Sequence, residues 1–345
     1  MNDDGYSELI ESGNLAIADM AMKCEAVFSN HRHAHVGISG GADSDVMLDL
    51  CERVRKVQPI RITYNFQDTG IEYRATRDHL DYLEERYGVK INRTRAIKSI
   101  PVCCHEHGLP FLSKMVSEQI GKLQKHGFKW EDLPLEELKK MYPDAPESAL
   151  KWWTNEYTTK SGAISSYCID RNRALKGFIL ENPPQFKVSS DCCYYAKKKT
   201  AKHALKKCKA DLDVTGMRRS EGGTRSLSGK CYIEASHYRA DRYRPLYWLS
   251  NQDRLEYSEK FGIRHSDCYE VWGFTRTGCV GCPFNKDVFN DLDIARPFEP
   301  NIVKAAEKIF GESYEYTRQY KDYRAKFMVE RQLQRDNDRA STEDQ

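Results

Sequence analysis

Residues 39–44, Ser-Gly-Gly-Ala-Asp-Ser, constrain the fold of this chain more than any other stretch. They follow a short run of strand-forming residues at 34–38 and precede a segment at 45–50 with the composition of a helix. A strand, a turn of small residues and a helix start together form a phosphate-binding turn, because glycine lets backbone N–H groups approach an anion and the helix start is electropositive. No Gly-Lys-Ser or Gly-Lys-Thr follows, so the turn is not a Walker loop. The predicted phosphate contacts come from Ser39, Gly40, Gly41, Asp43 and Ser44. The alternative is an ordinary turn in which glycine and aspartate only favour the bend.

Strand and helix patterns alternate over the first hundred residues. We expect strands at 34–38, 60–66 and 89–94, with helices at 44–57 and 72–87 between them. This alternation predicts an α/β fold, a parallel twisted sheet with helices on both faces. In such a sheet the ligand lies at the carboxyl ends of the strands, where the glycine turn also lies.

The alternation of strand and helix patterns ends at residues 101–160, which contain five prolines and three tryptophans. We interpret them as a mostly helical insertion. The expected division is 1–100 for the N-terminal half of a nucleotide-binding domain, 101–160 for the insertion, and 161–327 for the remainder of the domain with a cysteine-rich part. Residues 328–345 are charged and nearly free of apolar residues, so we expect a helix that runs out into a disordered tail.

The composition is that of a globular protein with a very polar surface, since 40% of the residues are hydrophobic and 30% are charged. No run approaches the roughly 18 apolar residues of a membrane-spanning helix, and the first residues lack the pattern of a signal peptide. We therefore expect a cytoplasmic protein with no membrane partner. Its 12 cysteines are then more often metal ligands, reactive thiols or buried small residues than disulfides. Nothing in the sequence specifies the oligomeric state.

Two further motifs follow expected strands and so belong at the same edge of the sheet. Residues 67–73, Gln-Asp-Thr-Gly-Ile-Glu-Tyr, offer side-chain acceptors and a flexible backbone. Residues 215–221, Thr-Gly-Met-Arg-Arg-Ser-Glu, offer two guanidinium groups whose forked donors suit phosphate or sulfate oxygens. The predicted binding residues are Asp68, Thr69, Gly70, Gly216, Arg218 and Arg219. The alternatives are a first-turn helix role for Glu72 and a basic surface loop for the arginines.

Four cysteines form two pairs, Cys192-Cys193 and Cys279-Val-Gly-Cys282, with 85 residues between the pairs. A Cys-x-x-Cys turn presents two thiolates to one metal centre. Adjacent cysteines suit a tetrahedral zinc poorly, because neighbouring side chains diverge, whereas they can ligate different irons of a [4Fe–4S] cluster. We predict that Cys192, Cys193, Cys279 and Cys282 hold such a cluster. A structural zinc, a redox dithiol and unliganded core thiols are the alternatives, and Cys268 is an alternative ligand.

Charge is distributed unevenly along the chain. The net charge is only +3, yet residues 197–230 hold eleven Lys or Arg against three Asp or Glu. Such a segment either is a solvated helix face or attracts a nucleotide or a nucleic-acid backbone.

In their order, these motifs resemble those of the phosphoadenylyl sulfate (PAPS) reductase family of the PP-loop ATP pyrophosphatase superfamily. Residues 39–44 resemble the PP-loop, 68–73 and 215–221 resemble segments near the nucleotide, and 245–249 resemble a further family segment. The four cysteines resemble those of the branch that holds one [4Fe–4S] cluster. The family commonly has Gln-Ser where this chain has Glu221-Gly222, so substrate recognition is expected to differ.

The resemblance implies an adenine-nucleotide enzyme of sulfur chemistry. Reductases of the family attack the sulfur of an adenylyl sulfate with a cysteine near the C-terminus, and no cysteine follows Cys282 here. The resemblance therefore favours the other reaction style, in which ATP with Mg²⁺ adenylates an acceptor and an external donor supplies sulfur. Asp43 is a candidate to position the Mg²⁺, and the acceptor can be a nucleic acid. The alternatives are a reductase that uses a thiol from elsewhere, such as Cys103 or Cys104, and a nucleotide- or nucleic-acid-binding protein without turnover. No catalytic residue is assigned.

Overall fold

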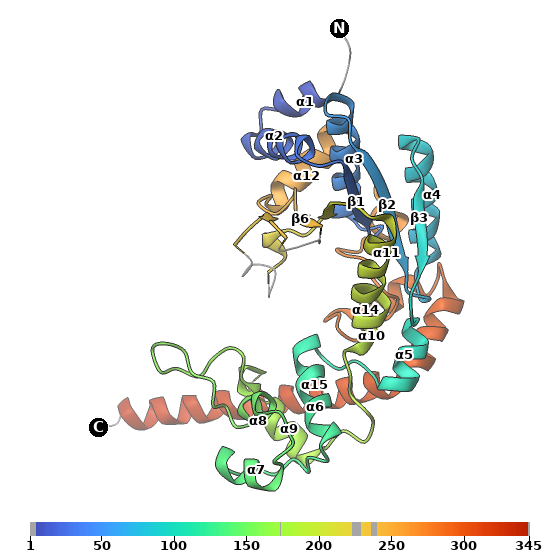
Figure 1. Cartoon of the computed structure of the whole chain (residues 1–345). Helices are drawn as coiled ribbons and strands as arrows, with labels where there is room; N and C mark the ends of the chain where they lie inside the picture. The colour runs from blue at the N-terminus through green and yellow to red at the C-terminus, as the bar shows by residue number, and fades with distance from the viewer. Residues whose placement is uncertain (1–4, 173, 223–228, 236–239, 344–345) are drawn as a thin grey trace. The chain divides into compact units, whose positions relative to one another are not determined.

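The computed structural model describes residues 5–172, 174–222, 229–235 and 240–343 (Figure 1). The chain forms two compact units. The first comprises Met1–Ile100, Tyr194–Val280 and Ile294–Ile302, and the second comprises Pro101–Cys193, Gly281–Asp293 and Val303–Gln345. The second unit thus begins where we expected the insertion to begin, and it extends past residue 160 to Cys193.

The first unit is built on a six-stranded sheet in the order β3-β2-β1-β4-β6-β5. All neighbouring strands are parallel except β5 and β6, which are antiparallel. The predicted α/β class with a parallel sheet is therefore confirmed. The strands are β1 (His33–Ile38), β2 (Arg61–Asp68), β3 (Ile91–Arg95), β4 (Leu212–Thr215), β5 (Tyr232–Ile233) and β6 (Asp241–Tyr243).

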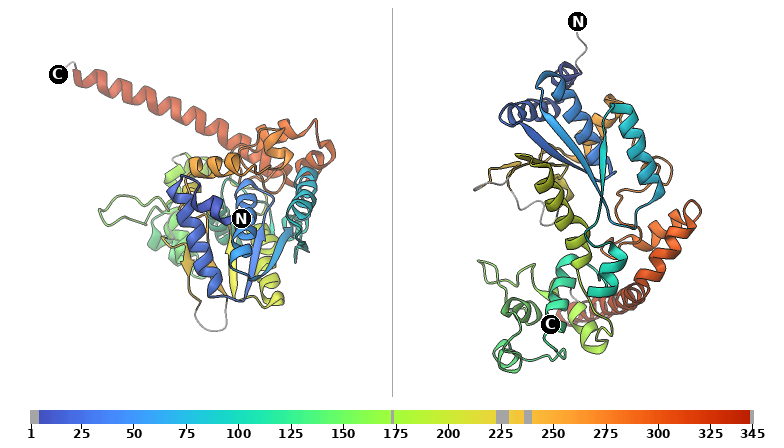
Figure 2. Two further views of the ribbon diagram at one scale, coloured as in Figure 1. Left: turned by 90° about the horizontal axis from the view of Figure 1, so that it is seen from above. Right: turned by 45° about the vertical axis from the view of Figure 1, so that its right-hand side comes forward.

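Helices cover both faces of this sheet (Figure 2). Helix α3 packs on one face together with α2 and α12, and α11 lies across β1, β2 and β3 on the other. The helical elements of this unit are α1 (Tyr6–Ile10), α2 (Leu15–Ser29), α3 (Ala42–Val57), α4 (Arg74–Tyr87), the π-helix η2 (Tyr194–Lys199), α11 (Thr200–Cys208), the 3₁₀-helix η3 (Arg219–Glu221), α12 (Asn251–Lys260) and α13 (Asp267–Glu270).

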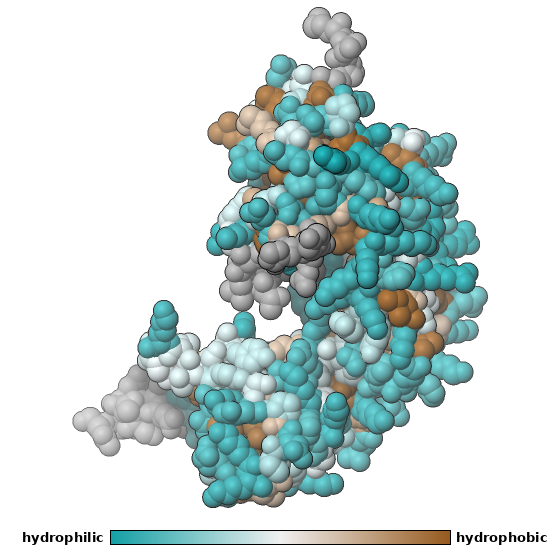
Figure 3. Space-filling view, in the orientation of Figure 1, coloured by the Kyte–Doolittle hydropathy of each residue, from teal (hydrophilic) through white to brown (hydrophobic). Residues whose placement is uncertain are grey.

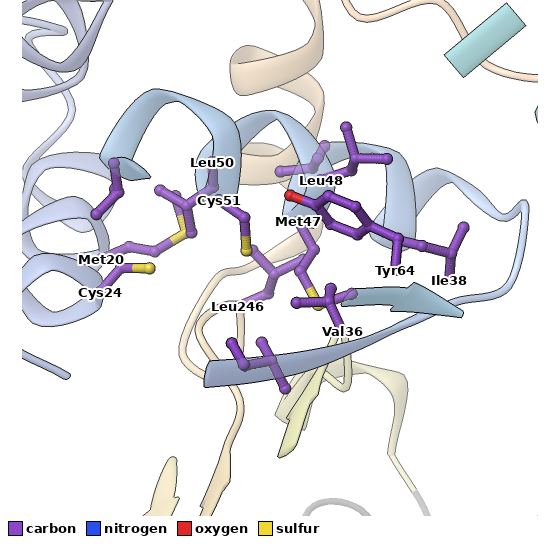
Figure 4. Close-up of a cluster of buried hydrophobic side chains, with 14 of the residues drawn as sticks. Met20, Cys24, Val36, Ile38, Met47, Leu48, Leu50, Cys51, Tyr64 and Leu246 are labelled. Atoms are coloured by element: carbon purple, nitrogen blue, oxygen red, sulfur yellow. The ribbon is translucent and has the colours of Figure 1, made fainter. Parts of the chain in front are cut away.

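Alternation along β1 decides what each face of the sheet contacts. Val36 and Ile38 point into the apolar core beneath α3, beside Met47 (Figure 4). In the same core the thiol of Cys24 is hydrogen-bonded to that of Cys51, which raises the pKa of Cys51 well above its usual value. These two cysteines are fully buried, so they serve as core residues of the first unit.

The second unit is helical and has its own aromatic core. Phe111 and Phe178 pack against Tyr316 of the C-terminal helix, with ring centroids 4.8 and 4.9 Å away. Most of this unit is formed by α5 (Ile100–His107), α6 (Lys114–Lys125), α7 (Leu135–Met141), α8 (Glu147–Trp153), the 3₁₀-helix η1 (Ile169–Asn172), α9 (Leu175–Glu181), α10 (Asp191–Cys193), α14 (Val288–Ala295) and α15 (Pro300–Glu343).

The C-terminal segment continues α15 as far as Glu343, where we expected a disordered tail from residue 328 onward. Neither glycine nor proline occurs between residues 312 and 343, so nothing in the sequence ends the helix there. Val329 and Leu333 are exposed, so α15 is solvated around these two residues. The face of the molecule drawn in Figure 3 is mostly hydrophilic.

Candidate functional site

The turns that follow β1, β2 and β4 emerge at one edge of the sheet. The last residue of β1, Ile38, is paired with Phe66 of β2, and Gly37 is paired with Thr215 of β4. Because the three strands are parallel and neighbouring, the three motifs predicted from the sequence are brought together in the first unit.

The turn after β1 has the shape of an anion cradle. Gly40 has a φ of +70°, and a Cβ there would lie 2.6 Å from Cγ2 of Thr76, so only glycine fits. Gly41 is the N-cap of α3 and has no side chain to cap it. The Ser44 N–H donates to the Gly41 carbonyl at 2.8 Å, so the N–H groups of Ala42 and Asp43 are the ones without an acceptor from their own helix. The Ser44 hydroxyl turns back to the Gly41 carbonyl at 2.7 Å, and the Ser39 hydroxyl lies 3.3 Å from that of Ser44. The two serines therefore stabilise the turn itself.

A tyrosine that the sequence reasoning missed lies over this turn. The Tyr269 hydroxyl accepts hydrogen bonds from the backbone N–H of Ala42 and of Thr277, the latter at 3.0 Å. A Cβ on Gly41 would lie 3.1 Å from this hydroxyl and 3.3 Å from Oγ1 of Thr277. Burial of the phenol raises the pKa of Tyr269, so it remains protonated. A phenol oxygen thus meets the first N–H of α3, the kind of donor that an anion would use.

The turn after β4 packs directly on the glycine turn. A Cβ on Gly216 would lie 3.2 Å from the carbonyl oxygen of Asp43, so glycine permits this approach. Arg218 is buried, and its Nε donates to Oδ1 of Asp43 at 2.9 Å while Nη1 donates to Ser220 and Asn251. Nε of Arg254 lies 3.5 Å from the same carboxylate oxygen. Two cations therefore surround the Asp43 carboxylate, and this placement does not fit our expectation that Asp43 positions Mg²⁺.

Arg219 has a different environment from Arg218. Its side chain is exposed, and its guanidinium carbon lies 5.5 Å from the ring centroid of Trp248, which is also exposed. Of the two predicted arginines, Arg219 is therefore the one that can meet an incoming anion, whereas Arg218 fixes the turn.

The turn after β2 connects to the first cysteine of the Cys-x-x-Cys motif. Asp68 accepts the N–H of Gly70 at 3.0 Å, which closes the turn, and Thr69 is fully buried. The Thr69 hydroxyl hydrogen-bonds to the Glu72 carboxyl and lies 3.7 Å from Sγ of Cys279. Burial raises the pKa of Glu72, which favours its neutral form. A hydrogen-bonded chain therefore leads from a buried carboxyl group to the Cys279 sulfur.

The other three predicted cysteines lie in the second unit, together with one that we had not assigned. The Cys192 thiol is hydrogen-bonded to the thiols of Cys104 and Cys193, and the charge of Cys282 also raises its pKa. The hydrogen bond with Cys104 is the largest of the effects that raise the pKa of Cys192 well above its usual value. Spacing could not identify Cys104, because it lies 88 residues before Cys192 on a helix of the insertion.

No group of three or more His, Cys, Asp or Glu side chains within the described ranges is arranged to hold a metal ion. Cys268, the alternative ligand, lies apart in the first unit at 3.9 Å from Oγ1 of Thr76. Burial raises its pKa to about 11, so this thiol is a structural one. The described helices include none that is long and apolar enough to cross a membrane.

Comparison with known proteins identifies a family. Residues 33–129 and 165–285 match the family described as phosphoadenosine phosphosulfate reductase domain. No curated protein matches the chain.

Three solved structures match the chain at low similarity. A PAPS reductase from Candida auris in complex with phosphate is 12% identical, with a TM-score of 0.41 over 81% of this chain and 96% of that one. The U34-tRNA thiolase NcsA from Methanococcus maripaludis with its [4Fe–4S] cluster is 15% identical, with a TM-score of 0.39 over 92% and 83%. An NH3-dependent NAD synthetase from Campylobacter jejuni is 12% identical, with a TM-score of 0.32 over 90% and 95%. At these values none of the three says what this chain binds.

Proposed function

This chain belongs to the phosphoadenosine phosphosulfate reductase family, and we propose that it is a PP-loop enzyme that uses an adenine nucleotide for sulfur transfer to an acceptor. The observation that supports this most is the convergence of three motifs at one edge of the sheet, with Gly216 against Asp43 and Thr69 against Cys279. A phosphate-binding turn and a cysteine of the Cys-x-x-Cys motif thus lie on adjacent turns of one unit.

The proposed reaction has two balanced steps. An acceptor hydroxyl oxygen attacks the α-phosphate of ATP, pyrophosphate leaves, and the hydroxyl proton goes to water. Sulfide from an external donor then displaces AMP, so that a carbon–oxygen bond breaks and a carbon–sulfur bond forms without net oxidation. The N–H groups at the start of α3 and the exposed Arg219 are suited to hold the pyrophosphate.

A [4Fe–4S] cluster is the proposed cofactor, and zinc is the alternative. The residues fit in kind, since Cys192 is hydrogen-bonded to Cys193, Cys282 lies in the same unit, and Gly281 has a φ of +62° that bends the Cys-x-x-Cys turn. Cys192, Cys193, Cys279 and Cys282 would hold the cluster. Such a cluster would bind and present sulfur for the transfer. In the absence of iron the Cys192 thiol remains protonated, as its raised pKa indicates.

The first experiment is a metal analysis of protein purified without oxygen. About four irons with matching acid-labile sulfide per chain support the proposal, and zinc without sulfide refutes the cluster. Cys282→Ser should abolish the charge-transfer absorbance of the cluster, while Cys208→Ser, a half-buried cysteine on α11, should leave it unchanged. Retention of the full absorbance in Cys282→Ser would exclude this cysteine as a ligand.

Turnover separates the candidate functions. ATP converted to AMP and pyrophosphate with candidate acceptors supports the sulfur transferase. Release of sulfite from an adenylyl sulfate, dependent on a reductant, would instead identify a reductase that uses a thiol such as Cys104. Nucleotide binding without either reaction would identify a binding protein that lacks turnover.

A further inference from the structure

Lysines cover the solvent side of the continuous helix formed by η2 and α11. We call them the lysine face, and they are Lys198, Lys199, Lys202, Lys206, Lys207 and Lys209, all of them exposed. Ala196, Thr200 and Ala204 repeat every four residues on the opposite side and are buried against the sheet. The sheet therefore directs every lysine of this face toward solvent.

The lysine face lacks the carboxylates that normally accompany lysines on a structural helix. Segment 194–208 contains six lysines and neither Asp nor Glu. In the described part of the chain none of the lysines of this face forms an ion pair, whereas Lys122, Lys139 and Lys151 of the second unit each do. Because like charges repel one another, such a face is stabilised by an anionic partner.

Two tyrosine rings lie at the start of the helix formed by η2 and α11. Tyr194 is 46% exposed, and its ring meets that of Tyr195 edge-on at 5.2 Å. The ammonium groups of Lys98 and Lys199 each lie 5.0 Å from the Tyr195 centroid. The hydroxyl of Thr200 holds the chain before Lys98 by accepting the N–H of Ile97 at 3.0 Å. An exposed ring beside a second ring that carries two cations is a combination suited to binding single-stranded nucleic acids.

The start of this helix also lies at the candidate site. Unlike the exposed lysines, Lys197 lies close enough to the buried Glu72 for its charge to lower the pKa of that carboxyl group, against the effect of burial. Lys197 is half-buried, and the π-helix η2 that carries it packs against β2, the strand that leads to the turn at 68–72. A chain bound along the lysine face would therefore reach the turn at 68–72.

From these observations we infer that the lysine face binds the sugar-phosphate backbone of a single-stranded nucleic acid, and that Tyr194 stacks one of its bases beside the turn after β2. This inference rests on the proposed function, because it identifies the acceptor of the sulfur as a nucleic acid. A membrane surface is less suited, since between Lys198 and Lys209 this described segment exposes no large apolar side chain.

The test is fluorescence anisotropy of a labelled RNA or DNA strand of about 20 nucleotides, titrated with the full-length protein at several salt concentrations. The variant is K202A/K206A/K207A. The matched control is K304A/K308A/K326A, which removes three exposed lysines of α15. We expect the first variant to bind at least about tenfold more weakly at 0.1 M salt and the slope of log affinity against log salt to fall by about 2, because each single-strand phosphate contact contributes roughly 0.7. The control should keep the wild-type affinity and slope.

Substitutions of Tyr194 test base stacking separately from electrostatic attraction. Tyr194→Ala should weaken binding by about five- to tenfold with an unchanged salt slope, and Tyr194→Phe should restore it, because stacking needs the ring and not the hydroxyl. Thermal melting of each variant checks that the fold persists.

The outcomes distinguish this inference from the proposed function. Equal affinities of the lysine-face variant and the control for nucleic acid would refute the inference, as would binding to vesicles with anionic lipids but not to either nucleic acid. If the wild-type protein binds ATP and carries iron but binds neither RNA nor DNA, this inference is refuted while the proposed function stands. If ATP does not bind at all, the proposed function fails as well.

Discussion

Adjacent glycines in the turn after β1 are required for different reasons. Gly40 needs the left-handed backbone region and has Thr76 against it, whereas Gly41 has an ordinary backbone and must leave room for Tyr269. Gly40 therefore allows the backbone conformation of the turn, and Gly41 leaves the space that the Tyr269 hydroxyl occupies.

Gly40→Ala should impair both the turn and nucleotide binding. A left-handed alanine costs about 1 to 2 kcal/mol, and its Cβ would push Thr76 away. We expect the free energy of unfolding in urea to fall by at least that amount, and calorimetry to detect much weaker ATP binding. Gly13→Ala is the control, because Gly13 is also left-handed but has no atom near its Cβ position. If both variants bound ATP equally, the turn would not be the phosphate site.

Tyr269→Phe should tighten ATP binding. In the free protein the Tyr269 hydroxyl already accepts the Ala42 N–H, so a phosphate must displace it to use that donor. Removing the competing hydroxyl should raise the affinity by about fivefold, the equivalent of one neutral hydrogen bond of about 1 kcal/mol. Tyr232→Phe, which loses a hydroxyl bonded to Asp241 on the far strands, is the control for calorimetry. Weaker binding in Tyr269→Phe would mean that the hydroxyl donates to the nucleotide instead.

At the scale of elements, one buried carboxylate holds the start of α3 in position. Asp45 is fully buried, and its Oδ2 lies 2.8 Å from Nδ1 of His265 and 3.1 Å from Nε2 of His79 on α4. Since His265 precedes α13, which carries Tyr269, this carboxylate joins three segments around the glycine turn.

The Asp45 carboxylate predicts a loss of stability in acid. Desolvation would raise the pKa of Asp45, but the hydrogen bond with His265 and the nearby imidazole of His79 outweigh it and the pKa is lowered. A carboxylate with a lowered folded pKa stabilises the protein above its unfolded pKa of about 3.9, and this stabilisation disappears as the pH falls through the folded value. We expect the urea concentration at the midpoint of wild-type unfolding to decrease as the pH falls below about 4.

Asp45→Asn tests this assignment. Loss of the buried charge should lower the free energy of unfolding at pH 7 by about 3 kcal/mol, because two imidazoles lose their partner. Below pH 4 the difference from the wild type should shrink. A difference that stays constant across this range would show that Asp45 does not titrate with folding.

At the scale of the whole molecule, the chain crosses between its two units several times, and each unit has its own core. The core of the first lies between the sheet and α3, and the core of the second is aromatic and centred on Phe178 and Tyr316. The C-terminal helix thereby completes a core that begins in the expected insertion.

Phe178→Ala should destabilise the second unit strongly. The ring is 1% exposed and contacts Tyr316 and Tyr320, so its loss should cost about 3 to 5 kcal/mol. Val329→Ala, on the solvated end of α15, should change the free energy of unfolding by less than about 0.5 kcal/mol. Circular dichroism during urea unfolding measures both, and a small effect of Phe178→Ala would contradict the core described here.

The local structure around each motif could be predicted because it depends on neighbouring residues. Residues 34–38 form a strand, Gly40 turns the chain, and α3 begins at Ala42, as alternation, glycine and the helix pattern indicate. The parallel sheet followed from the alternation of strands and helices. Residues 186–190 have the composition of a strand but form only an isolated bridge between Val188 and Leu109 within the helical unit.

Pairings between distant residues required the tertiary structure. Arg218 reads as an anion-binding residue in the sequence, but the strand order places it against Asp43, 175 residues away, so the two charges neutralise each other. In the same way the fold alone brings Tyr269 over Gly41, Cys104 to Cys192 and Lys197 close to Glu72. The sequence by itself determined the turns, the helices and the chemistry available at one edge of a parallel sheet, since these depend on short-range preferences. Only the order of the strands decided which of those groups bind each other and which remain available to a ligand. The physical reason is that strand order determines which distant side chains are buried next to one another.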